Sequence, residues 1–174
     1  MPSTIFLSSG TGDSPCPKRS GHIKRIKDFY LVGSSMGGWI SMELAANYAR
    51  PRKLVLIDSA GTASLDDMKF KSGLMELVSS FHEGESEQWD LLKSVILSSR
   101  PEEFLVNREI LDSLDMPVLV IWGEKDWILD PSFGSVLSGK IKNSSFHTIA
   151  SGDHTPFVTH PEEVASIINK FLLG

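Results

Sequence analysis

The run Lys53–Asp58 is apolar at nearly every position, and this limits the folds that the chain can adopt. A run of this kind is typical of a strand covered on both faces, as strands are in parallel sheets. Similar short apolar runs recur along the chain and alternate with segments whose apolar residues return at helical spacing. We therefore expect an α/β fold, with a mostly parallel sheet and helices on both of its faces.

The expected elements follow one another in a regular order. Strands are expected at 29–32, 53–58, 117–122 and 145–149, with a weaker one at 5–7. Helices are expected at 36–50, 132–138 and 161–173. Pro51 ends the first of these helices, and Pro161 lies in the first turn of the last. Ligands of such sheets bind beyond the carboxyl ends of the strands, so the loops there are the first place to look for a site.

Residues 62–115 differ in character from the segments on either side. They are more polar, contain many helix-forming residues and lack strand patterns. We interpret them as a short helical cap inserted into the sheet domain. The whole chain, residues 1–174, is expected to form one domain, since its length suits a single hydrophobic core.

Composition excludes several classes of partner. The formal net charge is −5, with 17 Lys and Arg against 22 Asp and Glu, so a nucleic-acid partner is not expected. No stretch reaches the roughly 18 apolar residues of a membrane span, and no secretory signal is evident at the N-terminus. Cys16 is the single cysteine, which excludes an intrachain disulfide and fits a reducing compartment. We therefore expect a cytoplasmic protein.

Cofactor sites are not indicated either. The chain has no G-x-G-x-x-G spacing at its strand–helix turn, which argues against a dinucleotide-binding loop. No His, Asp or Glu cluster has the spacing of metal ligands. We expect neither a metal nor a cofactor, and a small molecule as the substrate.

The turn after strand 29–32 carries the first chemical signal. Gly33-Ser34-Ser35-Met36-Gly37 fits G-x-S-x-G, in which a sharp strand-to-helix turn exposes a nucleophilic serine. The amide of Met36, the next residue, and the helix N-terminus would stabilise an oxyanion. A glycine-rich turn that binds phosphate, or nothing, is the alternative reading.

Two later loops supply candidates for the acid and the base. Asp126 follows strand 117–122, where a carboxylate could orient an imidazole; Glu124 and Asp130 compete with it for this role. His154 lies on the loop after the last strand, where it could reach both the serine and the acid. The order Ser35, Asp126, His154 is that of the serine hydrolases with a nucleophile elbow.

These motifs resemble the α/β-hydrolase superfamily, especially its esterases, meta-cleavage C–C hydrolases and proline iminopeptidases. The resemblance spans some 140 residues, and the motifs that carry it lie in 29–61, 117–131 and 151–164. It implies a serine hydrolase that cleaves an ester, amide or C–C bond of a small apolar carbonyl substrate. Trp127 and Phe157 are candidates to line the substrate pocket.

The chain also departs from this family before the elbow. Only 34 residues precede Ser35, and no His-Gly dipeptide is present to supply the second oxyanion donor; Ser8-Ser9-Gly10 occupies its place. The resemblance thus implies a truncated α/β-hydrolase fold. We expect strand 5–7 to pair beside strand 29–32, which would otherwise be an open edge. The shortened sheet makes self-association possible, and a weakly active or inactive hydrolase-like binding module is the alternative function.

Overall fold

Five parallel strands form one sheet in the computed structural model, which describes residues 3–7, 28–62, 76 and 106–174. The strands are β1 (Ser3–Leu7), β2 (Phe29–Ser34), β3 (Lys53–Ile57), β4 (Val118–Gly123) and β5 (Ser144–Ile149). They lie side by side in the order in which they occur along the chain, and every neighbouring pair is parallel. The predicted α/β class and parallel sheet are confirmed.

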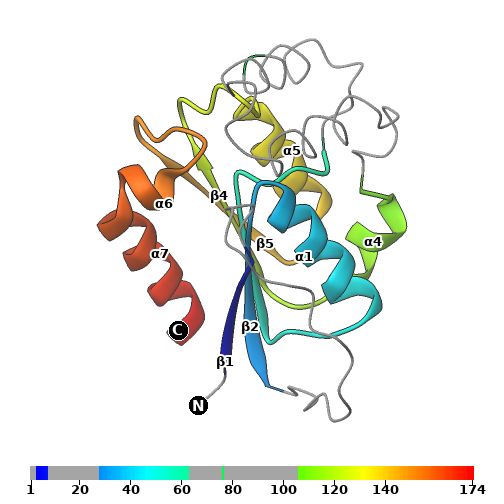
Figure 1. Cartoon of the computed structure of the whole chain (residues 1–174). Coiled ribbons are helices and arrows are strands. Elements are labelled where there is room, and N and C mark those ends of the chain that lie inside the picture. The colour runs from blue at the N-terminus through cyan, green and yellow to red at the C-terminus, as the bar shows by residue number, and fades with distance from the viewer. Residues whose placement is uncertain (1–2, 8–27, 63–75, 77–105) are drawn as a thin grey trace, which may run out of the picture.

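Strand β1 occupies the position expected of it. It pairs with β2 in parallel, from Ser3 opposite Phe29 to Leu7 opposite Gly33. In Figure 1 the dark-blue β1 lies along the edge of the sheet next to β2. The prediction that strand 5–7 would cover the edge of strand 29–32 is therefore confirmed.

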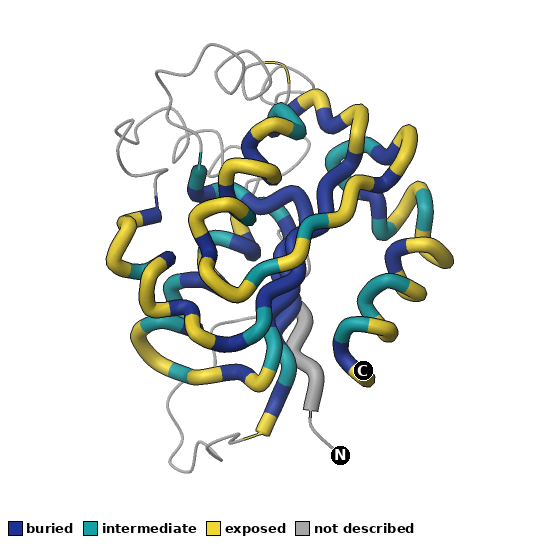
Figure 2. The backbone as a smooth tube through the Cα atoms, turned by 180° about the vertical axis from the view of Figure 1, so that it is seen from behind, coloured by how far each residue is buried: buried dark blue, intermediate teal, exposed yellow. Residues whose placement is uncertain are grey.

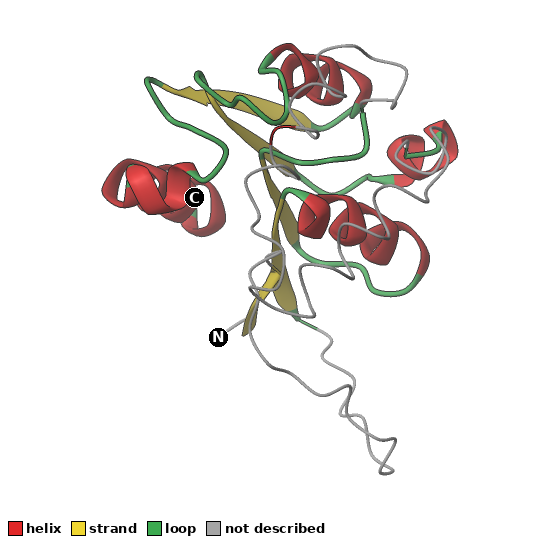
Figure 3. Ribbon diagram, turned by 45° about the horizontal axis from the view of Figure 1, so that its top comes forward, coloured by secondary structure: helices red, strands yellow, loops and turns green. Residues whose placement is uncertain are grey.

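Helices cover both faces of the sheet. They are α1 (Met36–Asn47), α4 (Arg108–Ser113), α5 (Ser132–Lys140), α6 (Pro156–Thr159) and α7 (Pro161–Leu173). Figure 3 shows α6 and α7 on one side of the strands and the other helices on the opposite side. Among the helices of the described residues, none has the length and apolar character that a membrane span requires.

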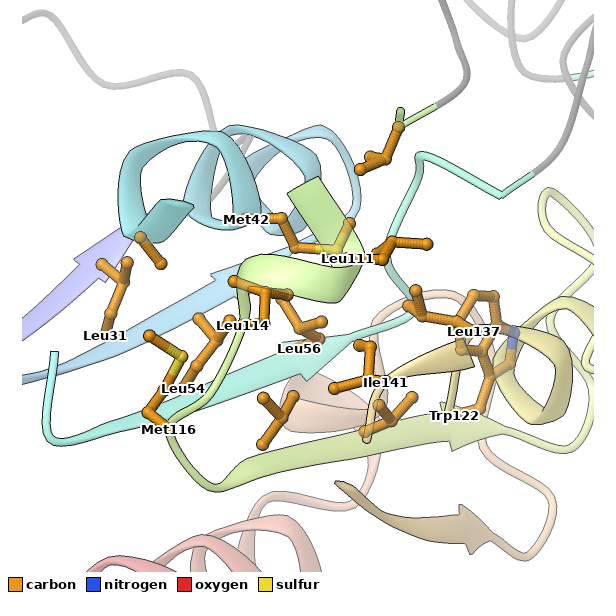
Figure 4. Close-up of a cluster of buried hydrophobic side chains, with 14 of the residues drawn as sticks. Leu31, Met42, Leu54, Leu56, Leu111, Leu114, Met116, Trp122, Leu137 and Ile141 are labelled. Atoms are coloured by element: carbon orange, nitrogen blue, oxygen red, sulfur yellow. The ribbon is translucent and has the colours of Figure 1, made fainter. Parts of the chain in front are cut away.

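The sheet separates two layers of apolar side chains. The larger layer fills the space between the strands and the helices α1, α4 and α5; Figure 4 shows Met42, Leu56 and Leu137 within it. The smaller layer, which includes Val55 and Ile121, packs against α7 through Val164. Alternate residues of β3 and β4 thus face opposite layers, which explains why these strands are apolar without interruption. Figure 2 shows the central strands β2, β3 and β4 as mostly buried and the outer faces of the helices as exposed.

The end of the predicted cap belongs to the larger apolar layer. Val106, Leu111 and Leu114 are buried there, on and beside α4, and Met42 of α1 belongs to the same layer. Residues 63–75 and 77–105, the greater part of the predicted insertion, lie outside the described residues, so the cap remains a prediction. Residues 8–27, which hold Cys16 and the Ser8-Ser9-Gly10 segment, also lie outside the described residues.

Candidate active site

Three side chains from three strand ends form a hydrogen-bonded series. Ser35 directly follows β2, Asp126 follows β4, and His154 follows β5. The Nε2 atom of His154 lies 2.9 Å from the Oγ atom of Ser35, and its Nδ1 atom lies 2.8 Å from the Oδ2 atom of Asp126. The structure thus brings together the three residues that the sequence singled out, although they lie 119 and 28 residues apart along the chain.

Ser35 has the strained backbone of a sharp turn. Its φ of 53° and ψ of −124° fall outside the regions that most residues adopt. Two hydrogen bonds, one to β3 and one to the loop after it, hold it there: its N–H donates to the carbonyl of Ile57 at 2.9 Å, and its carbonyl accepts from the N–H of Ala60 at 3.0 Å. The hydroxyl therefore lies at the carboxyl ends of the strands, on a backbone whose conformation the fold holds in place.

Close packing explains the glycines around the serine. A Cβ atom at Gly33 would meet the carbonyl of Gly37 and the Oγ atom of Ser41 at less than contact distance. A Cβ atom at Gly38 would lie 2.7 Å from the Cβ atom of Ser59, beyond the end of β3. Strand β2, helix α1 and the loop after β3 approach so closely here that only hydrogen fits.

The carboxyl group of Asp126 is buried, and both of its oxygens have hydrogen-bond partners. Its Oδ1 atom accepts hydrogen bonds from the N–H groups of Ile128 and Leu129, both at 2.9 Å, and its Oδ2 atom faces His154. The Asp126 side chain is 0% exposed, and that of His154 is 11% exposed. Backbone donors thus hold the carboxylate in one orientation, with an oxygen directed at the imidazole.

The two competing carboxylates have other partners. Glu124 accepts a hydrogen bond from the N–H of Ser151 at 3.0 Å, which joins the turn after β4 to the loop after β5. Asp130 accepts from the N–H of Ser132 at 3.0 Å, at the start of α5. Both are turn-stabilising contacts, whereas the carboxylate of Asp126 faces His154.

The loop that carries His154 is fastened on both sides. The N–H of Lys125 donates to the carbonyl of Gly152 at 2.7 Å, and Asp153 accepts from the N–H of Thr155 at 2.8 Å. Ser151 has a φ of 60°. These contacts hold the loop, and with it the imidazole of His154, in a fixed position beyond the carboxyl ends of the strands.

The other histidines lie elsewhere. His147 is exposed on β5, and His160 precedes α7, where its Nδ1 atom lies 3.0 Å from the Oγ1 atom of Thr159. His22 and His82 lie outside the described residues. Among the residues that the structure describes, no group of three His, Cys, Asp or Glu could hold a metal ion.

The remaining predicted site residues occupy different environments. Met36 is the first residue of α1, so its N–H is one of the amides that lack a partner within the helix. The indole of Trp127 follows Asp126 and is 45% exposed. Phe157, which belongs to α6, is partly buried and packs against the smaller apolar layer.

Sequence reasoning missed Asp58, which ends the apolar run of β3. Asp58 is 0% exposed and has a φ of 44°. Its Oδ1 atom accepts a hydrogen bond from the N–H of Gly123 at 2.8 Å, at the start of the turn that carries Asp126. A carboxylate at the end of a buried strand was the signal used for Asp126, and the same signal could have identified Asp58.

Burial is the main cause of a raised pKa at Asp58. It raises the pKa of this carboxyl group from 3.8 to about 9; the hydrogen bond from Gly123 opposes the rise, and the charges of Asp126 and Asp153 add to it. A carboxyl group with this pKa is neutral at pH 7, and Asp58 interacts with Asp126, the residue that faces His154.

The chain is similar to hydrolases by sequence and by structure. The model of the alpha/beta hydrolase family matches residues 14–167. A pimeloyl-[acyl-carrier protein] methyl ester esterase of Neisseria meningitidis is 36% identical over 67 residues, which are 38% of this chain and 26% of that protein. Monoacylglycerol lipase ABHD6 of Mus musculus is 27% identical over 193 aligned residues, covering 84% of this chain and 55% of the lipase.

A solved structure shares the fold over nearly the whole chain. The crystal structure of a membrane phospholipase A, described as a bacterial virulence factor, superposes with a TM-score of 0.75. The match covers 98% of this chain and 78% of the phospholipase at 19% identity, so it speaks for the fold alone. The chain thus spans between about a quarter and about half of the curated relatives named above.

Proposed function

Because this chain belongs to the alpha/beta hydrolase family, we propose that it is a serine hydrolase whose nucleophile is Ser35. The observation that carries the proposal is the series Ser35–His154–Asp126, with heteroatom distances of 2.9 and 2.8 Å. These are the distances at which an imidazole can take a proton from a hydroxyl while a carboxylate holds its other nitrogen.

Each residue has one role in the proposed reaction. His154 takes the proton of the Ser35 hydroxyl through Nε2, and the Oγ atom attacks the carbonyl carbon of the substrate. Asp126 accepts the Nδ1 proton, keeps the imidazole in the required tautomer and stabilises its charged form. The N–H of Met36, at the positive end of α1, faces the developing oxyanion. His154 then returns the proton to the leaving group, and water releases the acyl group by the same steps.

The proposed substrate is a small apolar carbonyl compound whose ester, amide or C–C bond is cleaved. Esters are the first class to test, because the two curated relatives are named for a methyl ester and a monoacylglycerol. Apolar character is supported by Met36, which is 40% exposed, and Trp127, which is 45% exposed, each adjacent in sequence to a proposed catalytic residue. We propose Trp127 and Phe157 as residues that contact the substrate.

Labelling with a fluorophosphonate probe tests the nucleophile. We expect the folded protein to be modified at Ser35 and to hydrolyse a short-chain p-nitrophenyl ester, and we expect both reactions to be lost in Ser35→Ala. Ser135→Ala is the matched control, because Ser135 is exposed on α5 and its hydroxyl only donates to the carbonyl of Ser132. A folded protein that is not labelled, and whose hydrolysis is the same in Ser35→Ala, would instead be a hydrolase-like binding module.

Two further properties form part of the proposal. The single cysteine, Cys16, supports a cytoplasmic location, which localisation of the tagged protein tests. Strand β1 forms one edge of the sheet, and self-association would protect that edge. Sedimentation at several protein concentrations measures whether the chain self-associates.

A further inference from the structure

Asp58 lies between the two halves of the proposed triad. It follows β3, whose neighbour β2 carries Ser35, and its N–H donates to the carbonyl of Ile121 in β4 at 3.0 Å. Its Oδ1 atom accepts from the N–H of Gly123, the last residue of β4, at 2.8 Å. Asp58 therefore holds the end of the strand from which the Asp126 turn departs.

The second carboxyl oxygen of Asp58 has no conventional donor within reach. Its Oδ2 atom is fully buried and accepts no hydrogen bond from any described residue. Asp126 lies near enough to interact with it by charge and through the side chains. Two ionised carboxylates in a buried site repel each other, whereas one proton between them makes a hydrogen bond. A proton on Oδ2 therefore accounts for an oxygen that would otherwise be unsatisfied.

Asp126 can accept one more hydrogen bond. Its Oδ1 atom already accepts from Ile128 and Leu129, while its Oδ2 atom faces only the imidazole of His154. Each carboxylate oxygen has two lone pairs, so Oδ2 has room for a second donor. The hydroxyl of a neutral Asp58 is a donor of the right kind.

We propose that Asp58 is a positioning residue of the site: one of its carboxyl oxygens is fixed by the Gly123 amide, and the other carries a proton that Asp126 accepts. The inference rests on the proposed function of Ser35, His154 and Asp126. The proton stays on Asp58 during turnover. It keeps the Asp126 carboxylate in the plane that suits the Nδ1 atom of His154.

The surroundings of Asp58 decide how it responds to pH. The titratable groups that face it are Asp126, from the turn after β4, and Asp153, from the loop after β5. Both are acids, so both favour the protonated form of Asp58. At high pH the loss of its proton removes the hydroxyl that Asp126 would accept and places a second negative charge beside Asp126, so the carboxylate of Asp126 loses the contact that positions it.

Two substitutions separate positioning from a purely structural role. Asp58→Asn keeps an acceptor for Gly123 and supplies an amide donor for Asp126, but it cannot ionise. Asp58→Leu has a similar size and neither group. We expect Asp58→Asn to retain kcat within about fivefold at pH 7 and Asp58→Leu to lose at least about tenfold. We also expect the wild type to lose activity on the alkaline side at a lower pH than Asp58→Asn does.

The control is Asp112→Asn, an exposed carboxylate on α4, which should reproduce the wild-type pH profile. The proposal is overturned if folded Asp58→Leu and Asp58→Asn both match the wild type in kcat and in pH profile. Unfolding curves of each variant show whether it is folded at the assay temperature.

A measurement without turnover tests Asp58 separately from the proposed function. The 13C resonance of its carboxyl carbon, assigned by its loss in Asp58→Asn, should show a protonated group at pH 7. An ionised group at pH 7 contradicts the proposal whatever the activity. If Ser35 proves unreactive, the proposed function fails. The 13C measurement still decides whether Asp58 carries the proton that Asp126 would accept.

Discussion

Backbone conformation at single residues controls the geometry of the site. Among the described residues, the non-glycine residues with positive φ are Ser35, Asp58 and Ser151, and each lies just past the end of a strand. Such conformations are costly and persist where the surrounding structure imposes them. Backbone strain among the described residues is thus concentrated at the carboxyl ends of the strands, where the proposed chemistry takes place.

Packing around Gly38 gives a first prediction. Gly38→Ala should lower the free energy of unfolding by about 1–3 kcal/mol, because the new Cβ atom would lie 2.7 Å from the buried Cβ atom of Ser59. Gly139→Ala in α5 is the matched control: nothing lies within 4 Å of its Cβ position, so it should be neutral or add about 0.4–1 kcal/mol. Urea unfolding measures both, and equal stabilities would contradict the close approach of α1 and the loop after β3.

The tautomer of His154 gives a second prediction. Asp126→Asn keeps an oxygen for Ile128 and Leu129 but places an amide against Nδ1, so the imidazole carries its proton on Nε2 and cannot act as a base. We expect kcat to fall by about 10⁴, with the fold retained.

Glu124→Gln and Asp130→Asn are the controls for this prediction, since these carboxylates accept hydrogen bonds from the amides of turns. Steady-state hydrolysis of the p-nitrophenyl ester measures all three variants. A large loss of kcat in one of the two controls, with Asp126→Asn still active, would indicate that the residue changed in that control is the acid.

At the level of elements, α7 is held at its carboxyl end by a side chain from the sheet. Lys53, the first residue of β3, donates to the carbonyls of Phe171 and Leu172 at 2.6 and 3.3 Å. Its Nζ atom lies 5.3 Å from the ring centroid of Phe171. The last carbonyls of a helix lack partners within the helix, so the ammonium group satisfies them and opposes the helix dipole.

Removing this cap should loosen α7. Lys53→Met keeps the apolar stem and loses the charge, and we expect it to lower the free energy of unfolding by about 1–2 kcal/mol. Lys142→Met, at an exposed position before β5, should change it by less than about 0.5 kcal/mol. Chemical unfolding of the two variants tests the difference, and an unchanged Lys53→Met would show that packing alone holds the helix.

The strands and most helices could be predicted because their patterns report burial directly. Alternation and apolar runs located β2 to β5, and the amphipathic pattern after Pro161 located α7 from its first to its last residue. Helix α1 ends at Asn47, three residues before the predicted Arg50, and the single-turn helix α6 was not predicted. Such short turns have no period of their own, and helix ends depend on local contacts.

Two features could not be predicted from one sequence. The pattern of Val106 and Leu111 shows that they are apolar but not which surface they meet, so they were assigned to the cap rather than to the main core. Asp58 was read only as the end of a strand, because its importance depends on Gly123, which lies 65 residues further along the chain. Ser35, Asp126 and His154 could be predicted because each lies in a loop that directly follows a strand with a recognisable apolar pattern.

At the level of the whole molecule, the buried proton of Asp58 makes stability depend on pH. The folded state keeps this proton up to about pH 9, while the unfolded chain loses it near pH 3.8. The folded state therefore loses stability relative to the unfolded state as pH rises between these values, by up to about 1.4 kcal/mol per pH unit. Below about pH 4 both states hold the proton and the effect disappears.

Asp58→Asn should remove this dependence. The free energy of unfolding of Asp58→Asn minus that of the wild type should grow from pH 5 to pH 8, because only the wild type has the group that titrates. Urea unfolding at four pH values measures it, and Asp112→Asn should give a difference that stays flat. A flat difference for Asp58→Asn as well would mean that the folded protein does not hold the proton.

The strand order also bears on the stage of folding at which the proposed triad can form. Every strand pairs with its chain neighbour, but the β3–β4 junction joins residues as distant as Asp58 and Gly123, 65 apart. Closing a long loop costs more entropy than closing a short connection, so we expect this junction to form late in folding. Ser35 stands on one side of it and Asp126 and His154 on the other. The proposed triad can therefore form only after the β3–β4 junction has closed.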